Sequence, residues 1–386
     1  MRKTASYNGG MIYVHVPFCA SRCIYCDFYS TTLPAPVREA YVEAACRELR
    51  ERTSYLPTSD IRTIYFGGGT PSQLTTEEIE ALLTCIRSTY NVQPQAEVTL
   101  ECNPDDITPA FVKAIKKMGI NRVSLGVQSF DDGILQLLNR RHSAQEAKDA
   151  VTFLSDYGIT NISIDLIYGL PRQDVQSFQR DLQTAFALPI RHLSSYALSV
   201  EKGTALARRI ADKQLTIASE ETFAAEYQLL MLEAKEHGFD HYEISNFALP
   251  DYASRHNSGY WDGTPYLGIG PGAHSFDGTD RRFNLPDVRA YIEQSARGLF
   301  PHETEHLHDF ERYNELIFTS LRTSRGLALS AVGQRFGKEV LEYLQKNARP
   351  HLQAGRLFIK EGQLIVAPNF ILVSDDIISD LMMEDE

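Results

Sequence analysis

Three of the six cysteines lie close together in the segment Cys19-Ala-Ser-Arg-Cys23-Ile-Tyr-Cys26. Thiolates at this spacing in one compact loop can bind three irons of a [4Fe–4S] cubane and leave the fourth iron open to an exogenous ligand. A structural zinc site is the alternative. Such a site needs four closed ligands, and the nearest further candidate, His15, lies four residues upstream on the preceding strand. The spacing therefore favours an iron–sulfur cluster over zinc or a chance grouping of thiols.

Further residues with chemical potential fall at or just after the ends of predicted strands. The run Gly67-Gly68-Gly69-Thr70 follows the second strand, where glycines allow positive φ and close approach of the backbone to a charged ligand. Glu101, Gln128 and Asp165 occupy equivalent places after later strands. Each alone has an ordinary explanation, a tight turn for the glycines and a helix cap or ion pair for the carboxylates. Together they predict a polar rim around the cysteine loop.

The elements that position these residues alternate between strands and helices. Apolar, β-branched runs predict strands, and the segments between them have helical period with N-caps at Thr75, Thr108 and Ser143. The predicted strands are residues 11–16, 61–66, 97–101, 122–126, 161–165 and 192–197, and the predicted helices are residues 39–50, 77–90, 109–118, 144–157 and 175–187. Alternation of this kind predicts an α/β fold with a parallel sheet, either doubly wound or curled into a barrel. In both cases chemistry gathers at the carboxyl ends of the strands.

The rhythm changes after about residue 201. A helix at 220–237 and a strand at 241–244 precede a segment rich in Gly, Pro and aromatic residues, which we expect to be mostly loop through Phe283. Helices at 313–323, 330–336 and 338–348 and a hairpin of strands 357–360 and 363–366 resemble a winged-helix module. We therefore expect a core at residues 1–200, an extension at 201–308 and a C-terminal module at 309–386.

The composition excludes several functional classes. The 386 residues carry a formal net charge of −12, which does not supply the basic surface that phosphate-backbone binding needs, so we expect no nucleic-acid partner. Residues 1–10 lack the apolar core of a signal peptide, and no apolar run is long enough to cross a bilayer. We expect a cytoplasmic protein that is not an integral membrane protein.

The cysteine spacing, with aromatic Tyr25 before the third cysteine, resembles the signature of the radical SAM superfamily. The resemblance implies a partial (β/α)6 parallel barrel whose open iron binds S-adenosylmethionine (SAM) through its amine and carboxylate, and one-electron cleavage of SAM to a 5′-deoxyadenosyl radical. The blocks along the whole chain are similar to the oxygen-independent coproporphyrinogen III oxidase family. That similarity implies cofactor contacts from Tyr13, Tyr25, Gly68, Gly69, Thr70, Glu101, Gln128, Arg140 and Asp165. Arg141 lies next to Arg140, so the sequence leaves the choice between the two arginines open.

Two differences separate the chain from the oxidases of that family. The oxidases carry a fourth cysteine two residues after the third, where this chain has Asp27-Phe28, and they carry an additional segment before the cluster strand. The wording Cys26-Asp27-Phe28 and the HNxxYW motif of His256, Tyr260 and Trp261 resemble a sister branch of haem chaperones. The resemblance implies haem contacts from these three residues, with His256 as a neutral imidazole ligand and the aromatic rings against the porphyrin. Plain packing of a turn and two aromatic residues is the alternative.

The sequence therefore predicts a radical SAM protein that binds haem as cargo and passes it to apo-haemoproteins, including those of a respiratory chain. The alternative is a porphyrinogen oxidoreductase of the coproporphyrinogen III oxidase type, and a purely structural cluster is a third possibility. Whether the protein is an enzyme, and whether it forms a homodimer, is left open by the residues.

Overall fold

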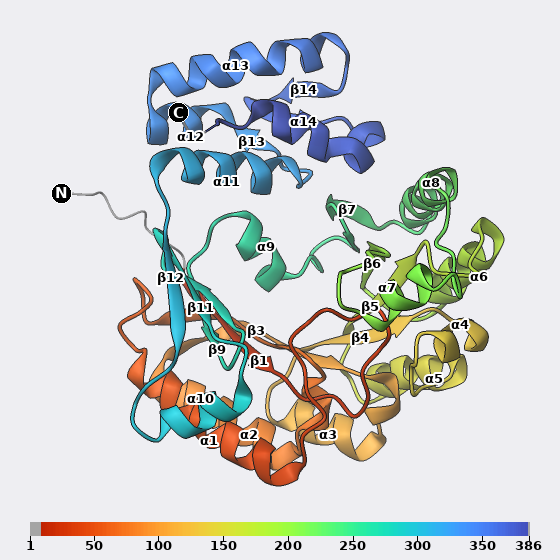
Figure 1. The fold of residues 1–386 in the computed structure, drawn as a ribbon, viewed down its shortest axis with the longest axis vertical. Helices are drawn as coiled ribbons and strands as arrows, with labels where there is room; N and C mark the ends of the chain where they lie inside the picture. Colours follow the sequence, from red (N-terminus) through yellow and green to blue (C-terminus); the bar gives the residue numbers. More distant parts are fainter. Residues whose placement is uncertain (1–8, 385–386) are drawn as a thin grey trace.

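In the computed structural model, which describes residues 9–384, one sheet of twelve strands forms the body of the molecule (Figure 1). Its strand order is β12-β11-β10-β9-β1-β2-β3-β4-β5-β6-β8-β7. Six neighbouring parallel strands in chain order make up the centre: β1 Gly10–Val16, β2 Asp60–Gly68, β3 Asn91–Cys102, β4 Arg122–Gln128, β5 Asn161–Tyr168 and β6 His192–Ala197. The six strands expected from the sequence are confirmed, and the sheet does not close into a full barrel within the described residues.

Helices follow the central strands and cover the outer face of the sheet (Figure 1). They are α1 Ala35–Glu51, α2 Thr76–Thr89, α3 Pro109–Lys117, α4 Asp132–Leu137, α5 Ala144–Asp156 and α6 Val175–Ala187, with short 3₁₀ turns at Pro71–Gln73 and Pro104–Asp106. Thr75 and Ser143 each form a capping box with the residue three positions on, and the side chain of Thr108 accepts a hydrogen bond from the Phe111 amide. The sequence missed only the short helix α4 among these.

The segment after residue 200 contains more regular structure than the sequence predicted. Its elements are α7 Ala205–Ala211, α8 Glu220–Glu236, β7 Asp240–Glu243, β8 Asn246–Ala248, α9 Arg255–Trp261, β9 Tyr266–Ile269, β10 His274–Phe276, β11 Asp280–Asn284, α10 Val288–Ser295 and β12 His302–His306. The expectation of a loop through Phe283 was wrong, because strands of three to five residues leave too little periodicity to read. Strand β9 pairs in parallel with β1, and the other added strands pair antiparallel.

The C-terminal module lies above the concave side of the sheet, with α9 between them (Figure 1). It consists of α11 Asp309–Leu321, β13 Leu327–Ala328, α12 Leu329–Phe336, α13 Lys338–Gln353, β14 Leu357–Lys360, β15 Gln363–Val366, a 3₁₀ turn at Pro368–Val373 and α14 Ser374–Leu381. The predicted hairpin is confirmed, and Glu361 and Gly362 both take positive φ in its turn. Strand β13 completes a three-stranded sheet of the winged-helix kind.

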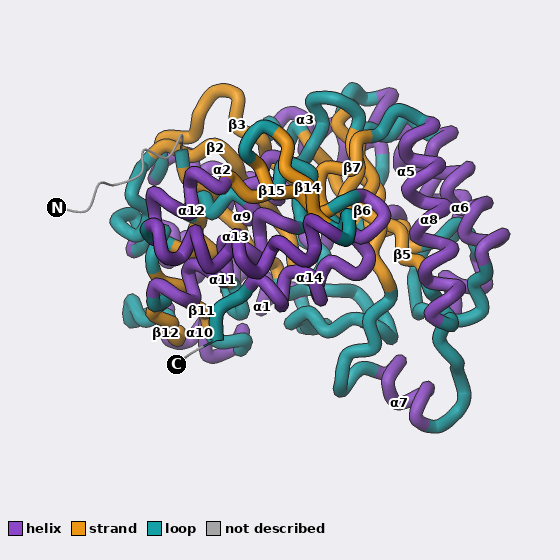
Figure 2. Tube along the Cα trace, turned by 90° about the horizontal axis from the view of Figure 1, so that it is seen from above, coloured by secondary structure: helices purple, strands orange, loops and turns teal. Residues whose placement is uncertain are grey.

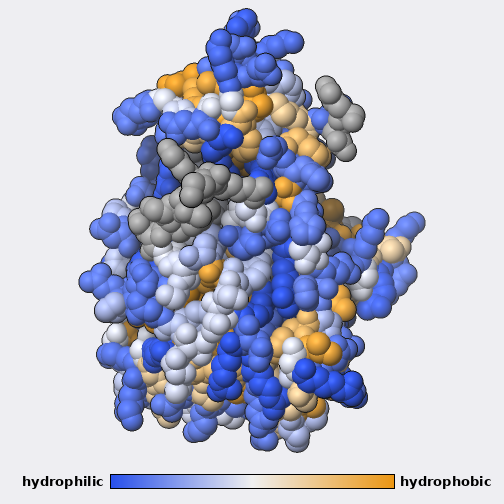
Figure 3. All heavy atoms as spheres, turned by 90° about the vertical axis from the view of Figure 1, so that its left-hand side faces the viewer, coloured by the Kyte–Doolittle hydropathy of each residue, from blue (hydrophilic) through white to orange (hydrophobic). Residues whose placement is uncertain are grey.

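Two large apolar clusters hold these parts together. The first fills the space between the parallel strands and their helices and continues into the segment after residue 200 through Leu267, Ile269 and Val288. The second lies within the C-terminal module, around Tyr313 and Leu344. Hydrophobic side chains also reach the surface of the upper part of the molecule, where this module lies (Figure 3). None of the helices among residues 9–384 combines the length and the apolar character that a bilayer-spanning helix needs.

Candidate functional site

The cysteine loop follows β1 and lies over the carboxyl ends of the parallel strands. Cys19, Cys23 and Cys26 are half-buried free thiols, and all three line one cavity of about 370 Å³. The Cys19 amide donates to the Thr31 carbonyl (2.9 Å), which holds the start of the loop against the chain that leaves it. Burial raises the pKa of the Cys26 thiol to about 11, so binding iron as a thiolate releases its proton.

These three thiols fit a [4Fe–4S] cluster with one open iron. In a cubane each thiolate binds a different iron, so the sulfurs do not have to converge on one ion. Within residues 9–384 no group of three or more His, Cys, Asp or Glu side chains is arranged to hold a single metal ion. His15, the further ligand considered for zinc, has both ring nitrogens engaged: Nε2 donates to the Tyr29 carbonyl and Nδ1 accepts from the Tyr13 hydroxyl, both at 3.0 Å.

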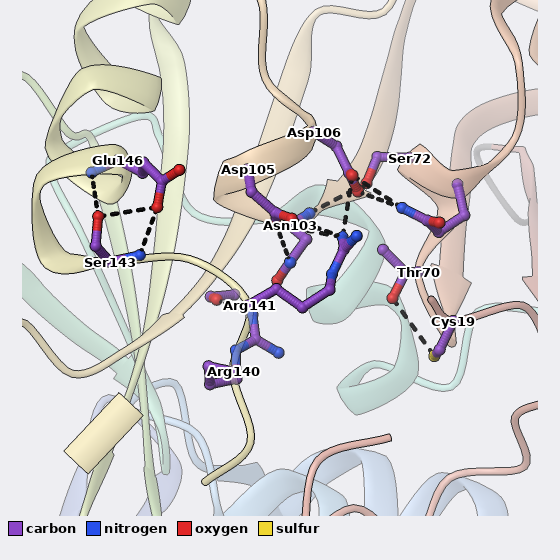
Figure 4. A network of polar contacts seen from close by, with 12 residues as sticks. Cys19, Thr70, Ser72, Asn103, Asp105, Asp106, Arg140, Arg141, Ser143 and Glu146 are labelled. Carbon is purple, nitrogen blue, oxygen red and sulfur yellow. Dashed lines mark hydrogen bonds and ion pairs between the residues drawn. The ribbon is translucent and has the colours of Figure 1, made fainter. Parts of the chain in front are cut away.

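Two polar side chains contact the cysteine sulfurs directly. The Thr70 hydroxyl donates to Cys19 Sγ at 3.4 Å (Figure 4), and Arg140 Nη1 donates to Cys23 Sγ at 3.3 Å. Hydrogen bonds and positive charge at thiolate sulfurs stabilise the electron-rich form of a cluster. The turn after β2 and the turn before α5 therefore each supply a contact that can tune a bound cluster.

Arg140 and Arg141 have different partners, which separates their roles. The Arg140 guanidinium also donates to Asn103 Oδ1 and to the Gly126 carbonyl, at the cavity wall. Arg141 instead pairs with the carboxylates of Asp105 and Asp106, both at 3.0 Å (Figure 4). Of the two arginines, Arg140 is the one that reaches the cysteine loop.

The glycine run after β2 needs glycine for two reasons. Gly68 has φ of +109°, and a Cβ at this position would lie 2.5 Å from the His15 ring. A Cβ on Gly69 would lie 2.9 Å from the carbonyl oxygens of Val16 and Phe18. The run therefore packs directly against β1 and the start of the cysteine loop, and it leaves backbone atoms exposed to the cavity.

Glu101, at the end of β3, accepts hydrogen bonds from the Tyr65 hydroxyl (2.6 Å) and the Gly68 amide (3.2 Å). Burial raises the pKa of this carboxyl to about 7. No lysine or arginine forms an ion pair with it within the described residues. A buried, unpaired carboxylate in a cavity is suited to a cationic ligand group such as an ammonium.

Gln128 and Asp165 lie further along the same rim. The pairing of β4 with β5 slips by one residue between Gly126 and Gln128, and Gln128 has φ of +72°, an uncommon value for a residue with a side chain. Bulges of this kind redirect a side chain, and both Gln128 and Asp165 line the cavity. Burial raises the pKa of Asp165, whose Oδ1 accepts a hydrogen bond from the Ser124 hydroxyl at 3.2 Å.

The cavity thus brings together most of the residues predicted from the sequence. Those that line it are the cysteines with Tyr25, Gly68, Gly69, Thr70, Glu101, Gln128, Arg140 and Asp165. Tyr13 does not line the cavity. It lies behind the cavity wall, where its hydroxyl is hydrogen-bonded to His15 and its ring is next to that of Tyr65. Sequence reasoning missed Asn103 and Ser124, although Asn103 stands in the Glu101-Cys102-Asn103-Pro104 block that it considered.

The HNxxYW residues lie elsewhere, on α9. Tyr260 and Trp261 line a second cavity, of about 870 Å³, between the sheet extension and the C-terminal module. His256 is 1% exposed and does not line it. Its Nδ1 is hydrogen-bonded to the Thr63 hydroxyl (2.7 Å) and its Nε2 to the Tyr260 hydroxyl (2.9 Å). Burial lowers the pKa of His256 to about 3, so its imidazole is neutral.

A second buried histidine, which sequence reasoning missed, has the same surroundings. His192 Nδ1 is bonded to the Ser163 hydroxyl (2.7 Å) and Nε2 to the Tyr242 hydroxyl (2.8 Å). Tyr242, like Tyr260, lines the larger cavity. Each histidine therefore lies behind a tyrosine of that cavity.

Known proteins resemble the chain at the level of fold over almost its whole length. The solved structure of coproporphyrinogen III oxidase (HemN) from Escherichia coli, described as a radical SAM enzyme, superposes with a TM-score of 0.84 and covers 97% of this chain and 90% of its own. The two sequences are 23% identical, so this likeness shows the fold alone.

Sequence comparison gives a closer grouping. The family model of the radical SAM superfamily matches residues 13–185, and that of the HemN C-terminal domain matches residues 307–368. The heme chaperone HemW of Mycobacterium tuberculosis (strain ATCC 25618 / H37Rv) is 37% identical over 327 residues, 83% of this chain and 84% of that protein. HemW of Bacillus subtilis (strain 168) is 32% identical over 85% and 87%. The chain belongs to the radical SAM superfamily and, within it, to the HemW family.

Proposed function

We propose that this protein is a cytoplasmic haem chaperone that binds haem and delivers it to apo-haemoproteins, including those of a respiratory chain. The observation that carries the proposal is the similarity to curated heme chaperones over more than four fifths of both chains. In this function Cys19, Cys23 and Cys26 hold a [4Fe–4S] cluster, and the cavity beside them binds SAM.

Different residues of the smaller cavity suit different parts of the SAM molecule. The open iron supplies a chelation site for the methionyl amine and carboxylate and a source of one electron. Glu101, with its acceptors facing the glycine run, suits the positive charge of the methionyl end. Gln128 and Asp165 supply polar groups for ribose hydroxyls, and Tyr25 supplies an aromatic face beside Cys23.

The larger cavity suits haem, a flat apolar ring with two carboxylates. Its walls include the aromatic residues Tyr260, Trp261, Tyr266 and Phe276, which can contact the porphyrin face. They also include arginines that can bind the propionates: Arg281, Arg312, Arg325 and Arg335. Residues from α9, the sheet extension and the C-terminal module share this cavity, so haem bound here would contact all three.

The geometry of the motif adds a condition to histidine ligation. The Tyr260 hydroxyl is hydrogen-bonded to Nε2 of His256, and the Thr63 hydroxyl is hydrogen-bonded to Nδ1. Ligation of haem iron by His256 therefore requires the Tyr260 side chain to leave its hydrogen bond. Movement of that one ring would connect the buried imidazole with the cavity.

The alternative function, a porphyrinogen oxidoreductase, is tested by supplying the protein with coproporphyrinogen III. Phe28 stands where the oxidases place their fourth cysteine, and its side chain is 64% exposed at the mouth of the smaller cavity. Anaerobically reconstituted protein should bind haem stoichiometrically, give a Soret band and pass haem to an added apo-haemoprotein. The same preparation, supplied with SAM, reductant and coproporphyrinogen III, should form no protoporphyrinogen IX. Robust conversion, or no haem binding, would refute the proposal.

A further inference from the structure

The cysteine loop has a second opening, which shares Arg22, Cys23, Cys26, Asp27 and Asn139 with the cavity assigned to SAM. There, a cavity of about 560 Å³ is lined by Cys23 and Cys26 on one side and by α7 and the turn before it on the other. The residues that line it include four cationic side chains, Arg22, Lys202, Arg208 and Arg209, and a single carboxylate, that of Asp27. Two of the three cluster ligands are therefore reached through a basic opening.

The basic character of this opening is local. The whole chain carries a formal net charge of −12, whereas this opening has four cationic side chains and one carboxylate. Within the described residues, the four cationic side chains form no ion pair, and Arg208 and Arg209 are exposed. Their charge is consequently available to a partner and is not neutralised inside the molecule.

The helix that carries these charges is fixed to the cysteine loop. The Leu206 amide of α7 donates to the Ile24 carbonyl at 2.8 Å, and the Ile24 amide donates to the Leu138 carbonyl at 3.2 Å. The Ile24 and Leu206 side chains share a small apolar cluster with Leu138 and Leu215. In Figure 2, α7 projects from the edge of the molecule. The projection therefore holds its cations beside the loop.

We propose that this basic opening, formed by Arg22, Lys202, Arg208 and Arg209, is the docking surface for an acidic, low-potential one-electron carrier protein that reduces the cluster. The inference rests on the cluster of the proposed function and does not depend on haem binding. One electron passes from the carrier to the oxidised cluster, so the carrier is oxidised by one electron and the cluster is reduced by one. No atom is transferred.

Physical considerations favour this partner. Electron transfer between proteins slows steeply with distance, and this opening is lined by Cys23 and Cys26, two of the three proposed cluster ligands. Electron carriers form small, transient interfaces, which complementary charge orients and accelerates. The net charge of −12 disfavours approach of an acidic carrier to the chain as a whole, whereas the cations of this opening attract it, which gives both speed and orientation.

The test compares two double charge reversals of equal size in the full-length protein. Arg208→Glu/Arg209→Glu changes the proposed surface. Lys346→Glu/Arg349→Glu changes two exposed residues of α13 in the C-terminal module by the same total charge. Iron, sulfide and thermal melts are measured first for all three proteins, with Lys202→Glu as the substitute should the first variant fold poorly. If the wild type held no cluster, the proposed function would be refuted. The docking surface would still be tested, because binding of the carrier to the wild type and the variants does not require a cluster.

The probe is a bacterial flavodoxin, oxidised for binding by calorimetry and fully reduced for stopped-flow reduction of the cluster. At low ionic strength the α7 variant should lose about tenfold or more in reduction rate and show weaker binding, while the α13 variant matches the wild type. Both should be reduced equally by the small methyl viologen radical cation. Equal rates and affinities in the two variants would overturn the proposal. Binding of a DNA duplex that the α7 variant loses would also overturn it, in favour of a nucleic-acid site.

Discussion

The Tyr260 hydroxyl lies 2.9 Å from Nε2 of His256 and stands between that imidazole and the larger cavity. Because both ring nitrogens of His256 have hydrogen-bond partners, the arrangement is compatible with packing as well as with ligation. Substitutions at the two residues separate these roles.

If His256 ligates haem iron, His256→Ala should shift or abolish the Soret band of the haem complex, and Tyr260→Phe should tighten haem binding by freeing Nε2. His256→Ala should also cost about 1–3 kcal/mol of stability, because the Thr63 hydroxyl is left buried without its partner. His192→Ala is the matched control, since it removes an equally buried imidazole with one hydroxyl on each nitrogen. Haem titrations beside thermal melts would decide. Equal loss of stability with unchanged Soret bands in both variants would leave His256 a packing residue.

Loss of one cluster ligand should be visible in metal content. Anaerobically purified protein should hold about four irons and four sulfides, and Cys23→Ala should lose them because one iron then lacks its thiolate. Cys85→Ala is the control, because Cys85 is buried on α2, outside the cavity of the cysteine loop. Adding SAM to the reduced wild type should change its EPR spectrum. Stoichiometric zinc without charge-transfer absorbance, or a spectrum indifferent to SAM, would contradict the assignment.

Arg140→Gln should leave the cluster in place but make it harder to reduce. The guanidinium 3.3 Å from Cys23 Sγ favours the reduced cluster, which carries one more negative charge, so removing it should lower the reduction potential. Arg141→Gln removes the same charge from a side chain that pairs with Asp105 and Asp106, and its effect should be smaller. Potentiometric titration followed by EPR measures both. Equal shifts would mean that only net charge matters.

Glu101 should make the SAM-free protein less stable as pH rises. Burial raises its pKa from 4.5 in the unfolded chain to about 7, so the folded state binds more protons between these values and stability falls as pH increases through that window. Glu101→Gln should remove up to about 3 kcal/mol of this fall and flatten the dependence of the thermal melt on pH. It should also weaken SAM binding. Identical pH profiles for the two proteins would show that Glu101 is ionised without cost in the folded state.

The sequence predicted the parts of the site that depend on local spacing. The cysteine loop follows β1 as expected, and the rim residues Glu101 and Gln128 lie at the ends of β3 and β4, because a parallel sheet gathers its carboxyl ends at one edge. Asp165 was expected at the end of its strand but lies inside β5, which continues to Tyr168, and it still lines the cavity. Arg140 and Arg141 are neighbours in the sequence, so the sequence alone could not show which guanidinium faces Cys23. The burial of His256 and the twin arrangement around His192 likewise depend on contacts between distant segments.

The same limit explains the strands that were missed. The strand of residues 266–269 has only four residues, which is too short for a clear alternation of apolar and polar side chains. Its parallel pairing with residues 11–14 joins segments that are far apart in the sequence. No local rule encodes such a partner. The winged-helix hairpin was readable because its turn, its two strands and its positive-φ residues are contiguous.

The place of β1 between β2 and β9 also governs how the protein must be made. On the ribosome the strand bearing the cysteine loop emerges early, but residues 266–269, which cover its second edge, emerge only much later. Until then β1 presents an open row of amides and carbonyls to other nascent chains. Fragments that stop before β9 should therefore aggregate, and insertion of iron and sulfide should be most efficient after translation has passed that strand.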